Sequence, residues 1–108
     1  MARKKLETLT EQMYYVLLAL SAGPRHGYEI MQVTFQLTGG RVSIGAGTLY
    51  ALLSRFEEEG YLTLHNVQDR RKYYALTPSG RAVLHEEYRR LRRQVADGAK
   101  LLEEEDMA

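Results

Sequence analysis

The sequence predicts a mainly helical α+β fold in which three helices are followed by a two-stranded hairpin and one long C-terminal helix. Apolar residues recur at helical spacing in three segments before residue 60. Between residues 61 and 76 apolar and polar residues alternate with a period of two, and helical spacing of the apolar residues returns from residue 78. A chain of 108 residues without repeats fits one domain, with length to spare for an extended helix.

The first helix is expected to begin near Thr8 or Thr10 and to be apolar on more than one side. A helix that is apolar on nearly all sides needs cover on nearly all sides. We therefore expect something beyond the small core of this domain to pack against it. One face carries Leu9, Met13, Val16, Leu17 and Leu20, and a second face adds Tyr14, Tyr15 and Leu18.

The second and third helices are each bounded by residues that start or stop helices. The second is expected from about Gly27 to Leu37, where Gly39-Gly40 allows the left-handed backbone that ends many helices. Ser43 is the expected N-cap of the third helix, and Gly60 its end. The expected core residues are Tyr28, Ile30, Met31 and Phe35 in the second helix and Leu49, Leu52, Leu53 and Phe56 in the third.

A β-hairpin is expected after the third helix. Leu62 and Leu64 alternate with polar or amphipathic neighbours, and the run from Tyr73 to Leu76 is a candidate for the second strand. The stretch between the strands is polar, and it leads into the basic run Arg70, Arg71 and Lys72. No Asn-Gly or Asp-Gly pair is present there, so the sequence does not specify the turn type.

The last helix is expected to begin at Thr77-Pro78, because Thr is a good N-cap and Pro suits the first helical position. It runs to about Leu102 and carries an apolar heptad seam, interrupted by Gly98. Such a seam can dock on its own domain, but this helix is longer than a small head can cover, which favours burial against a second copy. The expected dimer interface comprises Leu84, Tyr88, Leu91, Val95 and Leu102 with Tyr14, Tyr15 and Leu18.

This element order is that of a winged helix-turn-helix, in which the second helix of the motif enters the major groove of DNA. On the third helix, the side opposite the apolar residues is occupied by Gly47, Ala51, Ser54 and Glu58, most of which are small. Taken separately, the small residues could belong to an ordinary surface helix, and the basic run to a solvated hairpin tip. Their occurrence together with this element order favours DNA binding. The expected DNA-binding residues are Ser43, Gly47, Thr48, Tyr50, Ser54, Arg55, Arg70, Arg71 and Lys72.

Residues 1–77 are therefore interpreted as a DNA-binding head, and residues 78–108 as a dimerisation helix with an acidic tail. A winged-helix module that binds another protein is the main alternative, because fold does not fix function. Catalysis, metal binding and cofactors are not expected: there is no cysteine, and His26, His65 and His85 lack the spacing of a metal site. No apolar stretch is long enough to span a membrane, so a cytoplasmic location is expected.

Several short segments resemble the PadR family of transcriptional regulators, especially its short members with one C-terminal helix. They are His26-Gly27-Tyr28-Glu29-Ile30, Gly47-Thr48-Leu49-Tyr50, Leu53-Ser54-Arg55-Phe56-Glu57, Gly60-Tyr61-Leu62 and Arg71-Lys72-Tyr73-Tyr74-Ala75-Leu76-Thr77 with Gly80.

The resemblance implies a homodimer that binds an inverted-repeat operator in double-stranded DNA, usually as a repressor released by a small-molecule effector. Some family pockets use tryptophan, and this chain has none. Tyr14, Tyr15 and Tyr88 could line a pocket for a small aromatic effector, although packing in the core or seam is the favoured interpretation.

Overall fold

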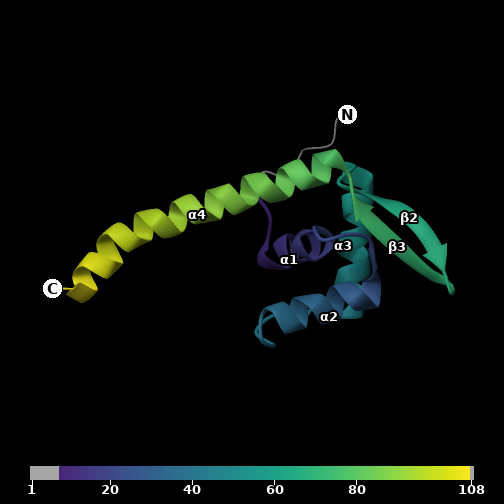
Figure 1. Cartoon of the computed structure of the whole chain (residues 1–108), viewed down its shortest axis with the longest axis horizontal. Coiled ribbons are helices and arrows are strands. Elements are labelled where there is room, and N and C mark those ends of the chain that lie inside the picture. The colour runs from purple at the N-terminus through teal and green to yellow at the C-terminus, as the bar shows by residue number, and fades with distance from the viewer. Residues whose placement is uncertain (1–7, 108) are drawn as a thin grey trace.

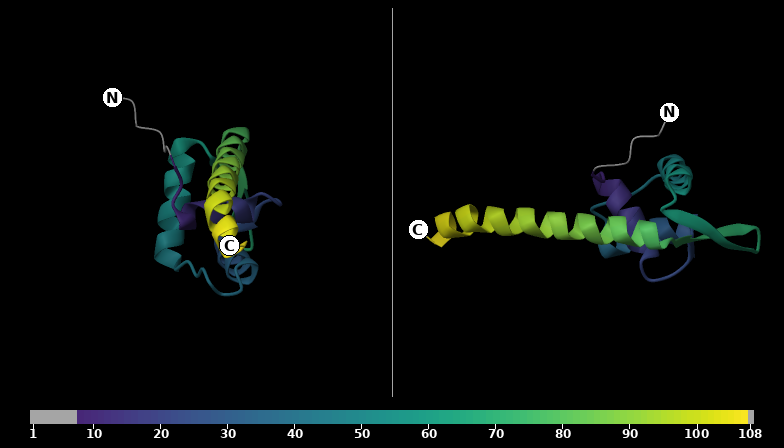
Figure 2. Two further views of the ribbon diagram at one scale, coloured as in Figure 1. Left: turned by 90° about the vertical axis from the view of Figure 1, so that its left-hand side faces the viewer. Right: turned by 90° about the horizontal axis from the view of Figure 1, so that it is seen from above.

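The structure, a computed structural model, describes residues 8–107, with side chains up to residue 103. A helical head carries two extensions that point in opposite directions, the β-hairpin on one side and the C-terminal helix on the other (Figures 1 and 2). The elements are α1 (Glu11–Leu20), β1 (Arg25–His26), α2 (Gly27–Leu37), α3 (Ala46–Glu59), β2 (Leu62–Gln68), β3 (Arg71–Leu76) and α4 (Pro78–Met107).

The core of the head lies between α1, α2 and α3 and is closed by the start of α4. Phe56, Leu17 and Ile30 are among its fully buried side chains, and burying each contributes about 1.5–3 kcal/mol. Two residues expected in this core are instead on the surface: Tyr28 is 56% exposed and Phe35 is 51% exposed. Helix α2 turns Ile30 and Thr34 toward the core, which leaves Tyr28 and Phe35 on its outer side.

Local caps define most helix ends. Thr10 caps α1 by accepting a hydrogen bond from the Met13 amide, and Gly60 ends α3 with a left-handed backbone. The expected cap of α3 at Ser43 is wrong, because the N-cap is Gly45 and no side chain caps it. The reason is the chain before it: Val42 and Ile44 are both buried, so this segment is extended and leaves Ser43 exposed between them.

The sheet has three antiparallel strands in the order β1-β3-β2. The hairpin turn has two residues, Asp69 and Arg70, with φ of 51° and 64°. Positive φ at both central positions is typical of the type I′ turn, whose twist matches that of the paired strands. The short strand β1 was not expected from the sequence, and it places His26 opposite Tyr73.

The start of helix α4 is anchored to the end of α3. The Thr77 hydroxyl donates to the Gly60 carbonyl oxygen at 2.6 Å and accepts from the Gly80 amide at 3.0 Å. The Thr77 amide donates to the Tyr61 carbonyl oxygen at 3.1 Å. Gly80 is needed for this close approach, because a Cβ atom at this position would lie 1.8 Å from the same oxygen.

One turn further along α4, Leu84 is buried in the core of its own head. It therefore closes the head and is not open to a partner, in contrast to its expected place in the dimer seam. Glu87 is also buried, and its carboxylate accepts hydrogen bonds from the Leu9 amide at 3.0 Å and from Arg90 Nη2 at 2.9 Å. The Arg90 guanidinium holds the pKa of Glu87 below its usual value; burial opposes this effect and the Leu9 amide adds to it.

Candidate nucleic-acid interface

Helix α3 presents a face of small side chains to solvent. Gly47, Ala51 and Ser54 are exposed, whereas Leu49, Leu53 and Phe56 on the opposite side are buried in the core. Thr48 and Tyr50 flank the exposed face and are also accessible. A helix with small outward residues can approach the floor of a major groove closely, and its flanking hydroxyls can reach base edges.

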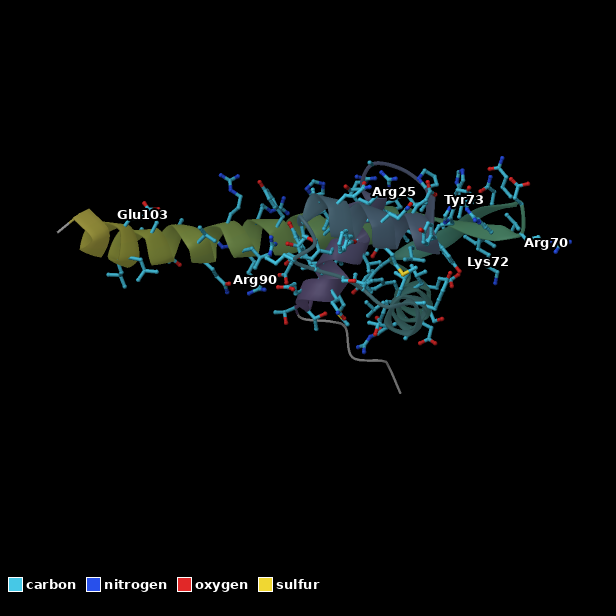
Figure 3. All side chains as sticks on the ribbon, turned by 90° about the horizontal axis from the view of Figure 1, so that it is seen from below. Arg25, Arg70, Lys72, Tyr73, Arg90 and Glu103 are labelled. Atoms are coloured by element: carbon cyan, nitrogen blue, oxygen red, sulfur yellow. The ribbon has the colours of Figure 1, made fainter. Side chains whose placement is uncertain are left out.

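The hairpin carries its basic residues at and near the tip. Arg70 lies in the turn itself, and Figure 3 shows its side chain at the far end of the hairpin. Arg71 and Lys72 follow at the start of β3, and all three side chains are exposed. Positive charge at an exposed tip suits contact with phosphates or with a narrow minor groove.

Five of the residues expected to bind DNA line one hollow between the start of α2, the outer side of α3 and the hairpin. We call it the wing–helix hollow; its volume is about 670 Å³. It is lined by His26, Gly27, Tyr28, Tyr50, Ser54, Glu57, Arg70, Arg71, Lys72 and Tyr74. Three cations against one carboxylate give the hollow a net positive lining.

The other expected DNA-binding residues lie outside this hollow. Gly47 and Thr48 are in the first turn of α3. Ser43 lies in the preceding loop, beside Met31 and Phe35 of α2. Arg55 is half-buried and its Nε atom is shielded from solvent. It is therefore less accessible to DNA than was expected from its place beside the small face of α3.

The start of α2 forms one wall of the hollow, a role that was not expected from the sequence. A Cβ atom at Gly27 would lie 2.8 Å from the Tyr50 hydroxyl, so the ring of Tyr50 closes over the start of α2. Burial raises the pKa of Tyr74 at the base of the hollow, with further contributions from Glu57 and Tyr50. The sequence feature that marks this wall is the His26-Gly27-Tyr28 segment, which is also part of the resemblance to the PadR family.

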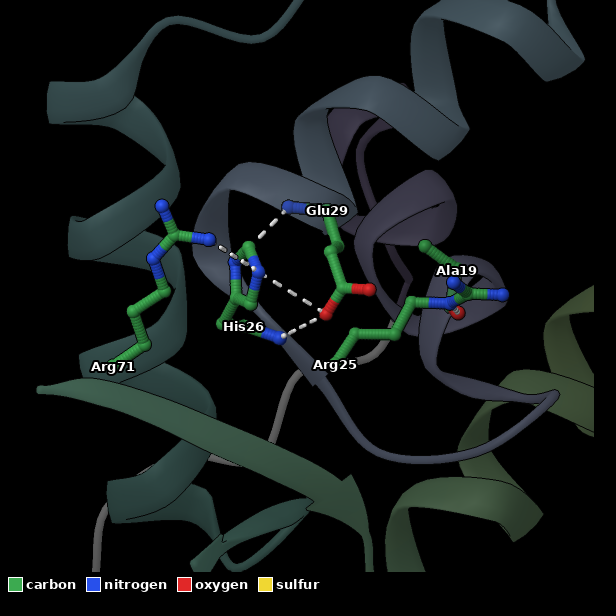
Figure 4. A network of polar contacts seen from close by, with 5 residues as sticks. All are labelled: Ala19, Arg25, His26, Glu29 and Arg71. Atoms are coloured by element: carbon green, nitrogen blue, oxygen red, sulfur yellow. Dashed lines mark hydrogen bonds and ion pairs between the residues drawn. The ribbon is translucent and has the colours of Figure 1, made fainter. Parts of the chain in front are cut away.

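His26 connects this wall to the hairpin (Figure 4). Its Nδ1 accepts from the Glu29 amide at 3.3 Å, and the Glu29 carboxylate accepts from the His26 amide at 3.2 Å, which completes a capping box. Its Nε2 lies 3.2 Å from Arg71 Nη1 and 3.4 Å from Glu29 Oε1. The Tyr73 ring and the imidazole pack edge to face, with centroids 5.2 Å apart.

The residues expected to form a dimer interface lie along α1 and α4, away from the hairpin. Tyr88, Val95 and Leu102 are 47%, 72% and 63% exposed, and Leu91 is half-buried. On α1, Tyr14, Tyr15 and Leu18 are half-buried against the core. The Tyr15 hydroxyl accepts a hydrogen bond from Arg41 Nη2 at 3.0 Å. Burial, followed by the nearby Tyr88 hydroxyl, raises the pKa of Tyr14.

Over the part of the chain that the structure describes, no three His, Asp or Glu side chains come together as a metal site. None of the helices in that part is long and apolar enough to cross a membrane.

Three packed helices, a basic hairpin and a long terminal helix define a winged helix-turn-helix protein of the DNA-binding regulator class. A family model described as the transcriptional regulator PadR-like family matches residues 16–86. The chain therefore belongs to the PadR-like family of transcriptional regulators, which confirms the resemblance. Members of this family are DNA-binding regulators and not enzymes, as expected.

Solved structures share this architecture. A transcriptional regulator from Clostridium thermocellum is 25% identical, with a TM-score of 0.74 over 83% of this chain and 88% of that one. Bacillus subtilis PadR in complex with operator DNA is 29% identical, with a TM-score of 0.61 over 68% of this chain and 44% of that one. The same regulator in complex with p-coumaric acid is 30% identical, with a TM-score of 0.58 over 68% and 41%.

Curated relatives cover less of this fold. An uncharacterised 37.1 kDa protein in a Streptomyces fradiae transposon is 39% identical over 67% of this chain. The chain spans 20% of the length of that protein and 61% of the length of an uncharacterised Lysinibacillus sphaericus protein.

Proposed function

We propose that this chain is a sequence-specific transcriptional regulator whose α3 enters the major groove of its operator. The observation that carries the proposal is the exposed small face of α3 beside a basic hairpin. In this arrangement Thr48 and Ala51 face base edges, and Arg70, Arg71 and Lys72 contact the backbone. The Bacillus subtilis PadR complex with operator DNA supports this assignment, because that protein shares the fold.

The proposal includes a homodimer that binds an inverted repeat. Helix α4 has 30 residues and extends about 45 Å, well beyond the head. Its exposed apolar side chains Tyr88, Val95 and Leu102, with Leu91, would each contribute about 1.5–3 kcal/mol if a second α4 covered them. A two-fold axis through this seam would place two α3 helices on successive turns of the major groove, about 34 Å apart.

Repression that a small aromatic molecule relieves is the regulatory part of this proposal. It is supported by the p-coumaric acid complex of the Bacillus subtilis relative. Tyr14, Tyr15 and Tyr88 provide aromatic surface near the seam for such a molecule, in place of the tryptophan that this chain lacks. Binding to operator DNA also implies a cytoplasmic location.

The test is Ala51→Glu, which adds a bulky negative group to the small face. Ala51 is exposed on a helix, so the fold should tolerate the change. We expect at least a hundredfold loss of affinity for an operator selected from random duplexes, measured by fluorescence anisotropy. Ala82→Glu on the exposed side of α4 is the matched control and should bind as the wild type does.

Salt dependence separates this function from that of a protein-interaction module. Binding to duplex DNA should weaken steeply between 50 and 200 mM salt, because each neutralised phosphate releases counterions. Equal affinity of the Ala51→Glu variant and the wild type for the selected operator would remove α3 from the groove. Failure to select any duplex would refute the DNA-binding role itself.

A further inference from the structure

In the wing–helix hollow, each ring nitrogen of His26 lies within hydrogen-bond distance of a donor: Nδ1 near the Glu29 amide and Nε2 near Arg71 Nη1. Because His26 Nδ1 accepts from the Glu29 amide, Nδ1 carries no hydrogen. A neutral imidazole has one N–H, which must then be on Nε2. Arg71 Nη1 lies 3.2 Å from that nitrogen and is also a donor, so the cap of α2 prevents Arg71 from bonding to His26.

With the α2 cap formed, the Arg71 guanidinium lies against the His26 ring, 3.2 Å from Nε2, without an acceptor there. Among the described residues, no carboxylate lies within ion-pair distance of it. The antiparallel pairing of Tyr73 with His26 fixes the first half of β3 beside the start of α2. The Arg71 side chain is exposed on the hollow side, so an anion from outside can reach it.

Further polar groups border the same space. Lys72 adds a second cation, and the Tyr50 hydroxyl is positioned above Gly27. The capping box at the start of α2 already uses the amides of His26 and Glu29, and the positive charges in the hollow come from side chains, not from the helix end. The hollow, with a volume of about 670 Å³, is large enough to admit a sugar–phosphate unit.

We propose that the wing–helix hollow seats one specific phosphate of the DNA backbone, with Arg71, Lys72 and the Tyr50 hydroxyl as ligands and His26 as the positioning residue. The proposal rests on the proposed function and assigns His26 and the start of α2 a part in it. A seated phosphate supplies the acceptor that Arg71 lacks. It also fixes the distance between the hairpin and α3, and therefore the register in which α3 meets the bases.

Glu57 is the one carboxylate in the lining and opposes an anion there. Removal of the Glu57 charge should change the affinity for DNA in the opposite direction from removal of a cation. Glu57→Gln should strengthen binding to all duplexes several-fold, whereas Arg71→Ala should weaken it. If Glu57→Gln weakened binding, the hollow would not hold an anion.

The main experiment locates the phosphate. Methylphosphonate linkages, which are uncharged, are placed one at a time along the selected operator, and affinity is measured by fluorescence anisotropy. One position in each half-site should lower the affinity of the wild type at least tenfold and leave that of Arg71→Ala unchanged. Equal sensitivity of the wild type and Arg71→Ala at every position would overturn the proposal.

Salt titrations provide the charge control. Arg71→Ala and Lys72→Ala should each reduce the slope of log affinity against log salt by about one, because one phosphate contact is lost. Lys100→Ala removes the same charge from the distal part of α4 and should leave the slope unchanged. Tyr50→Phe should weaken binding about fivefold with an unchanged slope, since a neutral donor releases no counterion.

The positioning role of His26 is tested with His26→Asn, because Asn is also a good helix cap and preserves the start of α2. We expect the variant to unfold at the wild-type temperature and to bind DNA more weakly. The loss should disappear in an Arg71→Ala background, because His26 acts through Arg71. The same loss in both backgrounds would refute the positioning role.

These outcomes are separate from those of the proposed function. If the wild-type chain does not bind duplex DNA, the proposed function is refuted. A wild-type chain that binds its operator, with Arg71 and Tyr50 variants that match it, refutes only the phosphate seat.

Discussion

Replacement of Gly80 by alanine tests how α4 is joined to the head. The added Cβ atom would lie 1.8 Å from the Tyr61 carbonyl oxygen, whereas real Cβ contacts are essentially never shorter than 3.0 Å. The difference between these two distances is about 1.2 Å, and the obstructing atom is backbone that cannot rotate away. The start of α4 must therefore move away from the end of α3.

The magnitude follows from what this movement breaks. Overpacking of this kind costs about 1–3 kcal/mol. Loss of the Thr77 hydrogen bonds to Tyr61 and Gly60 adds about 0.5–1.5 kcal/mol each. Alanine recovers about 1 kcal/mol through its higher helix propensity. We expect Gly80→Ala to lower the free energy of unfolding by about 1–5 kcal/mol.

The assay is urea unfolding followed by circular dichroism, at one protein concentration for all variants because dimer stability depends on concentration. Gly98→Ala is the matched control: it lies in the same helix, and nothing lies within 4 Å of an added Cβ. That variant should be more stable than the wild type by about 1 kcal/mol. A Gly80→Ala variant as stable as Gly98→Ala would refute the close packing of Gly80 against the Tyr61 carbonyl oxygen.

Two further predictions concern α4. Glu87 has a lowered pKa, so its contribution to stability is present above the unfolded value of 4.5 and is lost as the pH falls through the folded value. Glu87→Gln should therefore be less stable than the wild type at pH 7 by about 1–3 kcal/mol, with the difference shrinking below pH 4.5 in parallel urea titrations. The exposed neighbour Glu86→Gln should show no such difference, and a gap that persists to pH 2 would contradict the role of the carboxylate. Leu91→Asp places a charge in the exposed part of the seam and should yield monomers by analytical ultracentrifugation, together with loss of tight operator binding. Arg93→Asp, on the outer side of the same helix, should remain dimeric, and a dimeric Leu91→Asp variant would exclude this seam.

Local interactions explain why the element boundaries were largely predictable. Thr10 and Thr77 cap their helices with their own hydroxyls, and Gly60 ends α3 in the left-handed conformation. Each of these contacts spans only a few residues, so its signal is visible in the sequence. The buried face of α3 was predictable for the same reason, since Leu49, Leu53 and Phe56 repeat at helical spacing.

The errors arise where a longer-range contact decides the outcome. Tyr28 and Phe35 fit a helical pattern, but the orientation of α2 turns them to solvent. Ser43 is a good cap in isolation, yet the burial of Val42 and Ile44 delays α3 to Ala46. Strand β1 has two residues and exists only because β3 pairs with it, so no periodicity could indicate it.

The sequence by itself determined the order of the four helices and the hairpin, the small face of α3, the basic hairpin tip and the family. Only the tertiary structure decided that the start of α2, the side of α3 and the basic residues near the hairpin tip share one hollow. His26 and Arg71 are 45 positions apart, and strand pairing across that distance brings them within 3.2 Å. Proximity of this kind comes from the packing of whole elements, which leaves no local pattern along the chain.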